Sequence, residues 1–145
     1  MRPGAATISA ISVNSSGAVA ITYFDFRQAT SDTATLPTNY WQIVSADGGN
    51  TWQETPIAGP FDMMRAALAS QFYFLGDYHG LAASGDQFVP FFVATNPAPS
   101  PIPSSVFALP QPITGSTAWS GRVEINHHPR PFSARQVPKA KRSQR

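Results

Sequence analysis

The sequence predicts an all-β fold built from antiparallel hairpins. Short runs of aromatic and β-branched residues alternate with clusters of Gly, Ser, Asn and Pro, as strands alternate with turns. The 145-residue chain contains 14 prolines and 10 glycines, and only 12% of its residues are charged. Such a composition suits one loop-rich domain with an apolar core. Two hairpins of similar arrangement also follow each other along the chain, which favours a repeated β unit.

The first predicted hairpin joins residues 6–13 to residues 18–27 through a turn at 14–17. The first run consists of small and β-branched residues, and the turn reads Asn-Ser-Ser-Gly, with Gly17 suited to a left-handed backbone conformation. Apolar side chains occur at both odd and even positions of the second run. We therefore expect this strand to be covered on both faces.

A second predicted hairpin completes the unit. The polar segment 28–39 is expected to form a long loop, and the aromatic and β-branched run 40–46 a strand. A Gly-rich turn at 47–50 then leads into an extended run at 51–57. Residues 1–57 thus predict one four-stranded antiparallel unit.

The turn of this second hairpin carries a defined residue pattern, Ser-x-Asp-x-Gly-x-Thr-Trp. Its members are Ser45, Asp47, Gly49, Thr51 and Trp52. An aspartate in a Gly-rich turn can accept hydrogen bonds from backbone N–H groups just ahead of it, while the tryptophan offers an apolar body and one N–H donor. We expect Asp47 to be a structural acceptor, the alternative being a catalytic or metal-binding carboxylate.

The remainder of the chain is expected to form a less complete unit. Residues 58–71 are interpreted as a connector, with room for one helical turn at 63–68. Residues 72–112 predict a second, partial unit with a Ser-Gly-Asp hairpin turn at 84–86. Residues 113–145 are interpreted as an irregular, disordered tail, apart from a short edge strand near 123–125.

The charge is distributed unevenly between the body and the tail. Six of the ten basic residues lie in the last sixteen positions, leaving four basic residues against eight acidic ones before them. A basic tail can contact nucleic acid or anionic lipid. The alternative is a solvated terminus, which we expect because three prolines interrupt it and no helical apolar face is present: Pro129, Pro131 and Pro138.

Few residues suggest a metal or a cofactor. The chain has no cysteine, so it offers neither a disulfide framework nor a thiolate metal site. His127 and His128 are adjacent, but no carboxylate or third histidine stands at a useful spacing. We expect no cofactor and no metal.

The ordered combination of three segments resembles the C-terminal part of bacterial sialidase-like proteins. These segments are Tyr-Phe-Asp-Phe-Arg at 23–27, the Ser-x-Asp-x-Gly-x-Thr-Trp pattern at 45–52, known as the Asp-box or BNR repeat, and Gly-Asp-Tyr-His-Gly-Leu-Ala at 76–82. The resemblance covers about residues 6–95. It implies antiparallel β-propeller blades, of which this chain would supply about one and a half to two. A propeller needs roughly 4–8 blades to close, so the resemblance also implies a fragment of a longer chain.

The resemblance implies hydrolysis of a terminal glycoside such as a sialoside. Such enzymes clamp the substrate carboxylate with several arginines and use a tyrosine nucleophile, a glutamate base and an aspartate acid/base. This chain has two glutamates, Glu54 and Glu124, and lacks the Arg-Ile-Pro element that marks the first substrate arginine. We therefore expect the chain to be inactive alone. The alternative is a non-catalytic propeller module that binds glycans or proteins.

Two groups of residues are the candidates for catalysis. Asp25 and Arg27 lie two positions apart and so share one side of a strand, either at a channel mouth or as a local ion pair. Asp77, Tyr78 and His79 are flanked by glycines that permit a close approach to a ligand, and could transfer protons or attack a substrate. The structural alternative is that Asp77 bonds backbone amides and Tyr78 packs between blades.

The expected partners follow from the same resemblance. We expect a glycan or glycoconjugate and the remaining blades of a propeller, and a secreted or cell-surface location. The sequence itself shows no signal-peptide segment and no apolar run near the roughly 20 residues of a membrane helix. We expect neither a membrane span nor a nucleic-acid partner.

Overall fold

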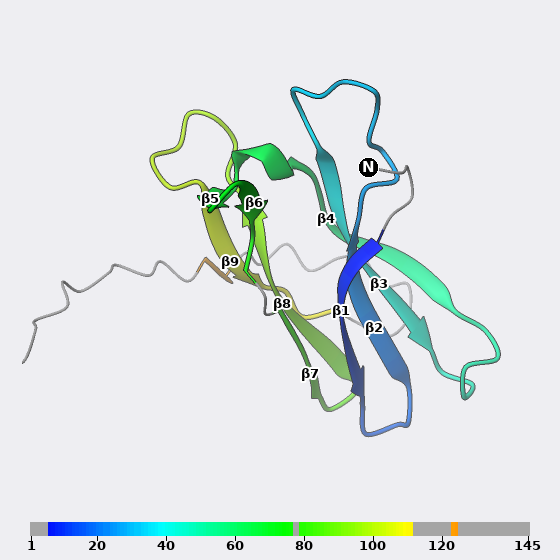
Figure 1. Ribbon diagram of the computed structural model, residues 1–145. Coiled ribbons are helices and arrows are strands. Elements are labelled where there is room, and N and C mark those ends of the chain that lie inside the picture. The colour runs from blue at the N-terminus through cyan, green and yellow to red at the C-terminus, as the bar shows by residue number, and fades with distance from the viewer. Residues whose placement is uncertain (1–5, 77–78, 112–122, 125–145) are drawn as a thin grey trace, which may run out of the picture.

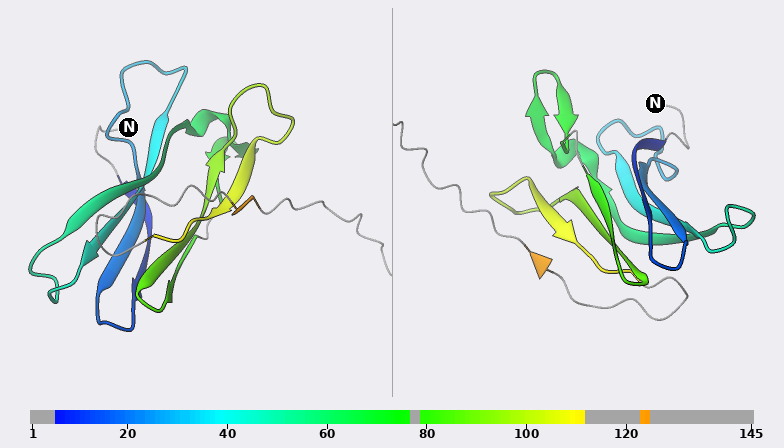
Figure 2. Two further views of the ribbon diagram at one scale, coloured as in Figure 1. Left: turned by 180° about the vertical axis from the view of Figure 1, so that it is seen from behind. Right: turned by 90° about the horizontal axis from the view of Figure 1, so that it is seen from below.

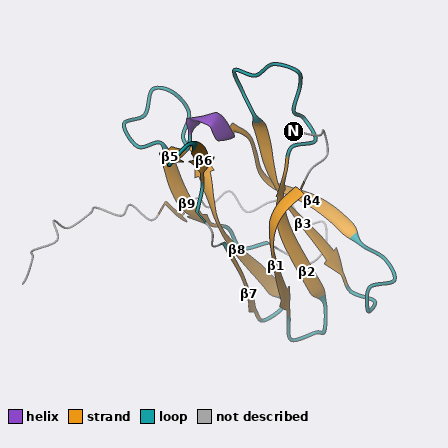
Figure 3. Cartoon of the chain, in the orientation of Figure 1, coloured by secondary structure: helices purple, strands orange, loops and turns teal. Residues whose placement is uncertain are grey.

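The computed structural model describes residues 6–76, 79–111 and 123–124. Its regular structure is almost entirely antiparallel β-sheet, which confirms the predicted all-β class (Figure 3). Within the described residues, no helix has the length and apolar character needed to span a membrane. The propeller arrangement itself stays a prediction.

The first sheet contains four consecutive strands in the order β1-β2-β3-β4. They are β1 (Ala6–Val13), β2 (Val19–Asp25), β3 (Pro37–Ser45) and β4 (Gln53–Asp62). The predicted first turn is confirmed, because Val13 pairs with Val19 and Gly17 has a φ of 82°. Both strands of the second hairpin are longer than predicted at the end away from the Asp-box.

The extra length of β4 reflects its place at the edge of the sheet. Pro56 and Pro60 lack an N–H donor, which an edge strand tolerates readily because one of its sides forms no strand pairing. The register of β3 and β4 shifts between Thr38 and Trp41, as in a β-bulge. Gly59 lies at this irregularity with a φ of 112°, and a Cβ there would lie 2.7 Å from the carbonyl oxygen of Thr38. Only glycine fits this position without displacing the backbone.

The second sheet repeats the same meander in the order β10-β9-β8-β7. Its strands are β7 (Gly80–Ser84), β8 (Gln87–Thr95), β9 (Ser104–Ala108) and β10 (Val123–Glu124). Ser84 pairs with Gln87, which confirms the hairpin turn predicted between them. The backbone of β10 pairs with β9, as expected of the short edge strand. The rest of the predicted tail lies outside the described residues.

A short helix and a small hairpin connect the two sheets. The helix is a single 3-10 turn, η1 (Met63–Arg65), capped by the side chain of Asp62, which accepts a hydrogen bond from Met64 N. The hairpin joins β5 (Ala67–Ala69) to β6 (Phe72–Phe74). It spans the expected boundary between 71 and 72, because the aromatic run at 72–74 pairs backward with β5.

The two sheets pack face to face and enclose the core (Figure 1). Ring stacking dominates its larger cluster: the Tyr40 ring lies 4.3 Å from Phe92 and 4.5 Å from Phe24, centroid to centroid. A second cluster joins Ala18 and Ala20 of the first sheet to Phe88 of the second. Aromatic rings at these distances add attraction beyond their buried area.

The two ends of the molecule differ in how the strands are connected (Figures 1 and 2). The segments 14–18, 46–52 and 85–86 are short and form what we call the tight-turn end. The longer segments at 26–36, 63–76 and 96–103 gather at the opposite end, the loop end. The two sheets are also bonded to each other at both ends: Ser15 Oγ donates to Gly85 O at 3.1 Å, and Thr95 Oγ1 donates to Asp62 O at 3.0 Å.

Candidate functional site

The Asp-box turn lies at the tight-turn end and satisfies its polar groups internally. Asp47 Oδ1 accepts from Thr51 N at 2.9 Å, and Oδ2 accepts from Thr51 Oγ1 at 2.6 Å. Ser45 Oγ donates to Asp47 at 2.8 Å and accepts from Gly49 N at 2.8 Å. Trp52 Nε1 donates to Gly49 O at 3.1 Å, the kind of carbonyl partner expected for its indole.

These hydrogen bonds set the charge state of Asp47. Donation from Thr51, followed by donation from Ser45, lowers the pKa of Asp47 from 3.8 to about 2. The carboxylate is therefore ionised at neutral pH and has no proton to give. Trp52 remains substantially exposed and packs on its own turn. Asp47 and Trp52 therefore help to build the turn, and neither is placed as a catalytic group.

A second polar group lies on the outer face of the first sheet, the face turned away from the second sheet. This arginine cluster consists of Tyr23, Asp25, Arg27, Trp41 and Glu54. Arg27 donates from its two terminal nitrogens to the two Glu54 carboxylate oxygens at 2.8 Å each, and from Nε to Asp25. Its guanidinium lies 4.1 Å from the centre of the Trp41 ring, and Trp41 Nε1 donates to Asp25 at 3.1 Å. Bidentate pairing and ring stacking together fix the arginine.

The arginine cluster contains a tyrosine–glutamate pair, the pair that the family resemblance associates with nucleophilic attack. The Tyr23 hydroxyl donates to Glu54. However, the hydrogen bonds from Arg27 and then Tyr23 lower the pKa of Glu54 to about 2, while burial and then Glu54 raise the pKa of Tyr23 to about 12. Glu54 is thus a very weak base toward a very weak acid. This pair is arranged to keep the proton on tyrosine, which is the reverse of nucleophile activation.

The sequence pointed to only two of these five residues. Asp25 and Arg27 were singled out as a pair, and the ion pair between them is present. Tyr23 follows from the same period of two, because alternate residues share a face of a strand. Trp41 and Glu54 belong to neighbouring strands and reach the cluster through strand pairing: Tyr23 pairs with Trp41, and Ile43 pairs with Glu54. A local sequence pattern does not predict which residues of different strands are paired.

The other candidate group is only partly described. Asp77 and Tyr78 lie outside the described residues. His79 is half-buried just before β7, with its ring edge-on to Phe24 at 5.6 Å and to Tyr40 at 5.7 Å. Burial lowers the pKa of His79, and its buried Nε2 has no hydrogen-bond partner among the described residues. A neutral imidazole is therefore expected at pH 7.

The first sheet separates His79 from the arginine cluster. Adjacent residues of a strand point to opposite faces, so Asp25 faces the arginine cluster while Phe24 faces the second sheet. His79 contacts Phe24 and hence lies on the opposite side of the sheet from Arg27. The structure therefore does not bring His79 and Arg27 together in one catalytic centre. Within the described ranges, no group of three or more His, Cys, Asp or Glu side chains is placed to hold a metal ion.

Comparison with known protein families and curated protein sequences identifies no relative of this chain. No protein-family model matches the chain, and no curated protein sequence is significantly similar to it. The functional interpretation therefore depends on the residues themselves and on the resemblance of their motifs.

Proposed function

We propose that this chain forms two adjacent blades of a sialidase-like β-propeller, and that on its own it binds a glycan rather than hydrolysing one. The blade interpretation is supported by the two successive four-stranded meanders that pack face to face. Each meander also exposes apolar side chains on its outer face. They are Ile11 and Val13 on the first sheet, and Phe91 and Val106 on the second. On the first sheet they share that face with the charged arginine cluster. Exposed apolar side chains of this kind are suited to contact with further sheets.

The observation that carries the binding function is the aromatic hairpin at the loop end. The side chain of Phe72 is 75% exposed, and Leu68, Tyr73 and Phe74 are exposed as well. Phe72 and Phe74 share one face of β6, and Tyr73 lies on the other opposite Leu68. The hairpin therefore exposes apolar side chains on both of its faces, and a concentration of exposed apolar groups favours an interaction site. Flat rings with a polar hydroxyl suit the apolar faces and hydroxyl groups of a sugar.

The arginine cluster supports the expected lack of hydrolysis. Its tyrosine and glutamate are held with pKa values of about 12 and about 2, so Glu54 does not draw the proton from Tyr23. Glycoside hydrolysis completed by further blades is the second candidate function, favoured by the Gly-Asp-Tyr-His-Gly segment at 76–80. A fluorogenic sialoside tests whether the chain hydrolyses a glycan on its own. We expect no turnover by the purified chain; turnover that Tyr78→Phe abolishes would contradict the proposal and establish a hydrolase that needs no further blades.

The binding test compares two aromatic residues of different location. The chain is screened on a glycan array, and the strongest glycan is titrated against Phe72→Ala and against the control Phe91→Ala, which removes an exposed ring from β8. Loss of one stacking ring is expected to weaken binding about fivefold in Phe72→Ala, and to leave Phe91→Ala close to the parent. If no glycan is retained, or if both variants bind like the parent, the proposal is wrong.

A further inference from the structure

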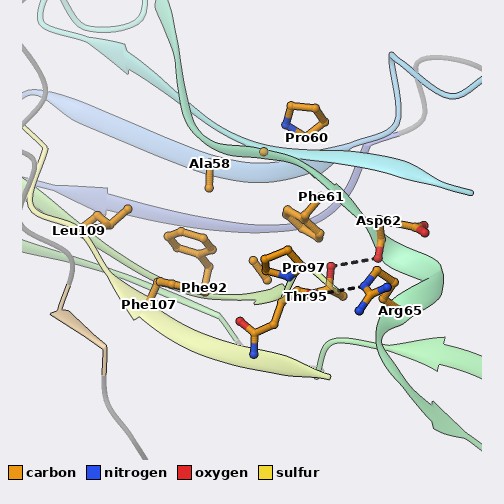
Figure 4. Close-up of a pocket in the computed structure, with 13 residues that line it drawn as sticks. Ala58, Pro60, Phe61, Asp62, Arg65, Phe92, Thr95, Pro97, Phe107 and Leu109 are labelled. Atoms are coloured by element: carbon orange, nitrogen blue, oxygen red, sulfur yellow. Dashed lines mark hydrogen bonds between the residues drawn. The ribbon is translucent and has the colours of Figure 1, made fainter. Parts of the chain in front are cut away.

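A cavity of about 650 Å³ lies between the two sheets, where the edge strand β4 of the first faces the central strands β8 and β9 of the second (Figure 4). Cavities of this size are typical of sites for small organic ligands. Most of its wall is apolar and partly aromatic, contributed by Ala58, Phe61, Phe92, Phe107 and Leu109. Neither the arginine cluster nor the aromatic hairpin β5–β6 contributes to it.

One end of this inter-sheet cavity carries a fixed positive charge. Arg65, in η1, lines the cavity and donates from Nε to the carbonyl oxygen of Asn96 at 3.0 Å. That bond orients the guanidinium and leaves its two terminal nitrogens without a hydrogen-bond or ion-pair partner among the described residues. Thr95 and Asn96 also line the cavity. Their side chains are engaged, because Thr95 Oγ1 donates to Asp62 O, and Asn96 Nδ2 donates to Ile102 O and Ser105 Oγ.

A carboxylate also lines the cavity, and one of its oxygens bonds backbone groups. Asp62 Oδ1 accepts from Leu36 N at 2.9 Å and from Met64 N at 3.0 Å, in its role as cap of η1. Among the described residues, Asp62 and Arg65 form no ion pair with each other. The end of the cavity therefore combines an oriented guanidinium and the Asp62 carboxylate with an apolar interior. An arginine in such a position is suited to bind an external carboxylate through two parallel hydrogen bonds.

We propose that the inter-sheet cavity binds a small organic carboxylate with a flat apolar body. The carboxylate pairs with the terminal nitrogens of Arg65, and the apolar body lies among Phe61, Phe92 and Phe107. Burial of the body removes apolar surface from water, and the charge pair sets the orientation. This site is distinct from the glycan site proposed above, so either can fail without the other.

The first experiment separates charge from apolar contact. 3-Phenylpropanoate and its neutral amide, 3-phenylpropanamide, are titrated into the chain and followed by NMR chemical shifts. We expect the carboxylate to bind at least about tenfold more tightly than the amide, as for a charge-assisted hydrogen bond. Shifts should centre on Phe92 and Phe107. Equal affinity, or no saturable binding of either compound, would overturn the proposal.

Two kinds of variant then test the placement. Arg65→Gln should remove the preference for carboxylate over amide, and Arg65→Lys should restore it in part, because a lysine keeps the charge but lacks the planar fork. Ala58→Leu should block both compounds by filling the apolar part, while Ala67→Leu on exposed β5 serves as the matched control. An unchanged preference in Arg65→Gln, or unchanged binding in a folded Ala58→Leu, would contradict the site.

Discussion

The tight-turn end and the loop end of this molecule are built on different principles. At the tight-turn end, side chains of the two turns in the first sheet accept backbone N–H groups of the same turn: Asn14 Oδ1 accepts from Ser16 N and Ala18 N, and Asp47 accepts from Thr51 N. At the loop end, long segments expose apolar rings such as Phe72, and the inter-sheet cavity opens beside them. One end specifies the strand pairing, whereas the other leaves surface free for ligands. Function in β-structures concentrates on such loops because the sheets position them.

The largest effect is expected at the glycine of the β4 bulge. In Gly59→Ala the new Cβ would lie within 3 Å of Thr38 O and Asn39 Cα, at a φ that L-residues rarely adopt. Gly48, in the Asp-box turn, also has a positive φ of 74°, but no atom lies within 4 Å of its Cβ position. We expect losses of about 3 kcal/mol for Gly59→Ala and about 1 kcal/mol for Gly48→Ala, measured by urea unfolding. Equal losses would show that the crowding at Gly59 is relieved at little cost.

A smaller loss is expected from a buried turn side chain at the tight-turn end. Asn14 is buried, and its side chain accepts from Ser16 N at 3.1 Å and from Ala18 N at 2.9 Å. Asn14→Ala leaves the Ala18 donor unsatisfied and should cost about 2 kcal/mol. The exposed Asp32 makes a similar local bond to Ala34 N at 2.8 Å within the loop end. Asp32→Ala should cost less than about 0.5 kcal/mol, because water replaces the lost acceptor.

The contrast between the ends also explains what the sequence could predict. The turns at 14–17 and 84–86 were predicted because turn chemistry is local: glycine supplies positive φ, and Asn or Ser bonds its own backbone. Pairing of the run at 72–74 with 67–69 was missed, since nothing in an aromatic triplet says which neighbour it joins. The arginine cluster likewise needs the register of three strands, which places Tyr23 beside Trp41 and Glu54 near both.

The inter-sheet cavity had no counterpart in the sequence. It is formed by residues from β4, η1, β8 and β9, and its size depends on how closely two sheets approach. Arg65 lies in a segment interpreted only as a connector, and its importance comes from the lack of a carboxylate partner among the described residues. Neither the size of the cavity nor the lack of a partner for Arg65 can be predicted from one sequence, because both depend on how distant segments pack.

The next effect concerns acid stability at the Asp-box turn. Asp47 has a pKa of about 2 in the folded protein against 3.8 ordinarily, so it contributes stability above pH 4 that is lost as the pH falls toward 2. Thr51→Val removes the hydroxyl donor and should raise the titration midpoint of Asp47 toward 3.8, measured by NMR of its carboxyl carbon. Stability should then depend less on pH between about 4 and 2. An unchanged midpoint would show that the remaining donors, chiefly Thr51 N and Ser45 Oγ, account for the low pKa without the Thr51 hydroxyl.

Only a small effect on stability is expected in the arginine cluster, although it contains three charged side chains. Arg27 and Glu54 are both partly exposed, and an ion pair in such a position contributes little because water solvates the separated charges well. Glu54→Gln keeps the shape of the side chain, and Arg27 retains Asp25 as a partner. We expect a loss of at most about 1 kcal/mol. A loss well above that would mean that the cluster, rather than the turns, fixes the register of β2, β3 and β4.

The same variant also tests the electrostatic interpretation of Tyr23. Burial is the main reason that the pKa of Tyr23 is raised to about 12, and the hydrogen bond and charge of Glu54 come second. Glu54→Gln should therefore lower the Tyr23 midpoint only in part, as followed by ultraviolet absorbance titration with Tyr23→Phe as the control that identifies its signal. A midpoint that fell to the ordinary value of 10 would show that Glu54 alone holds the proton on Tyr23. In that case Tyr23 could ionise once Glu54 was neutralised, and its tyrosinate could act as a nucleophile.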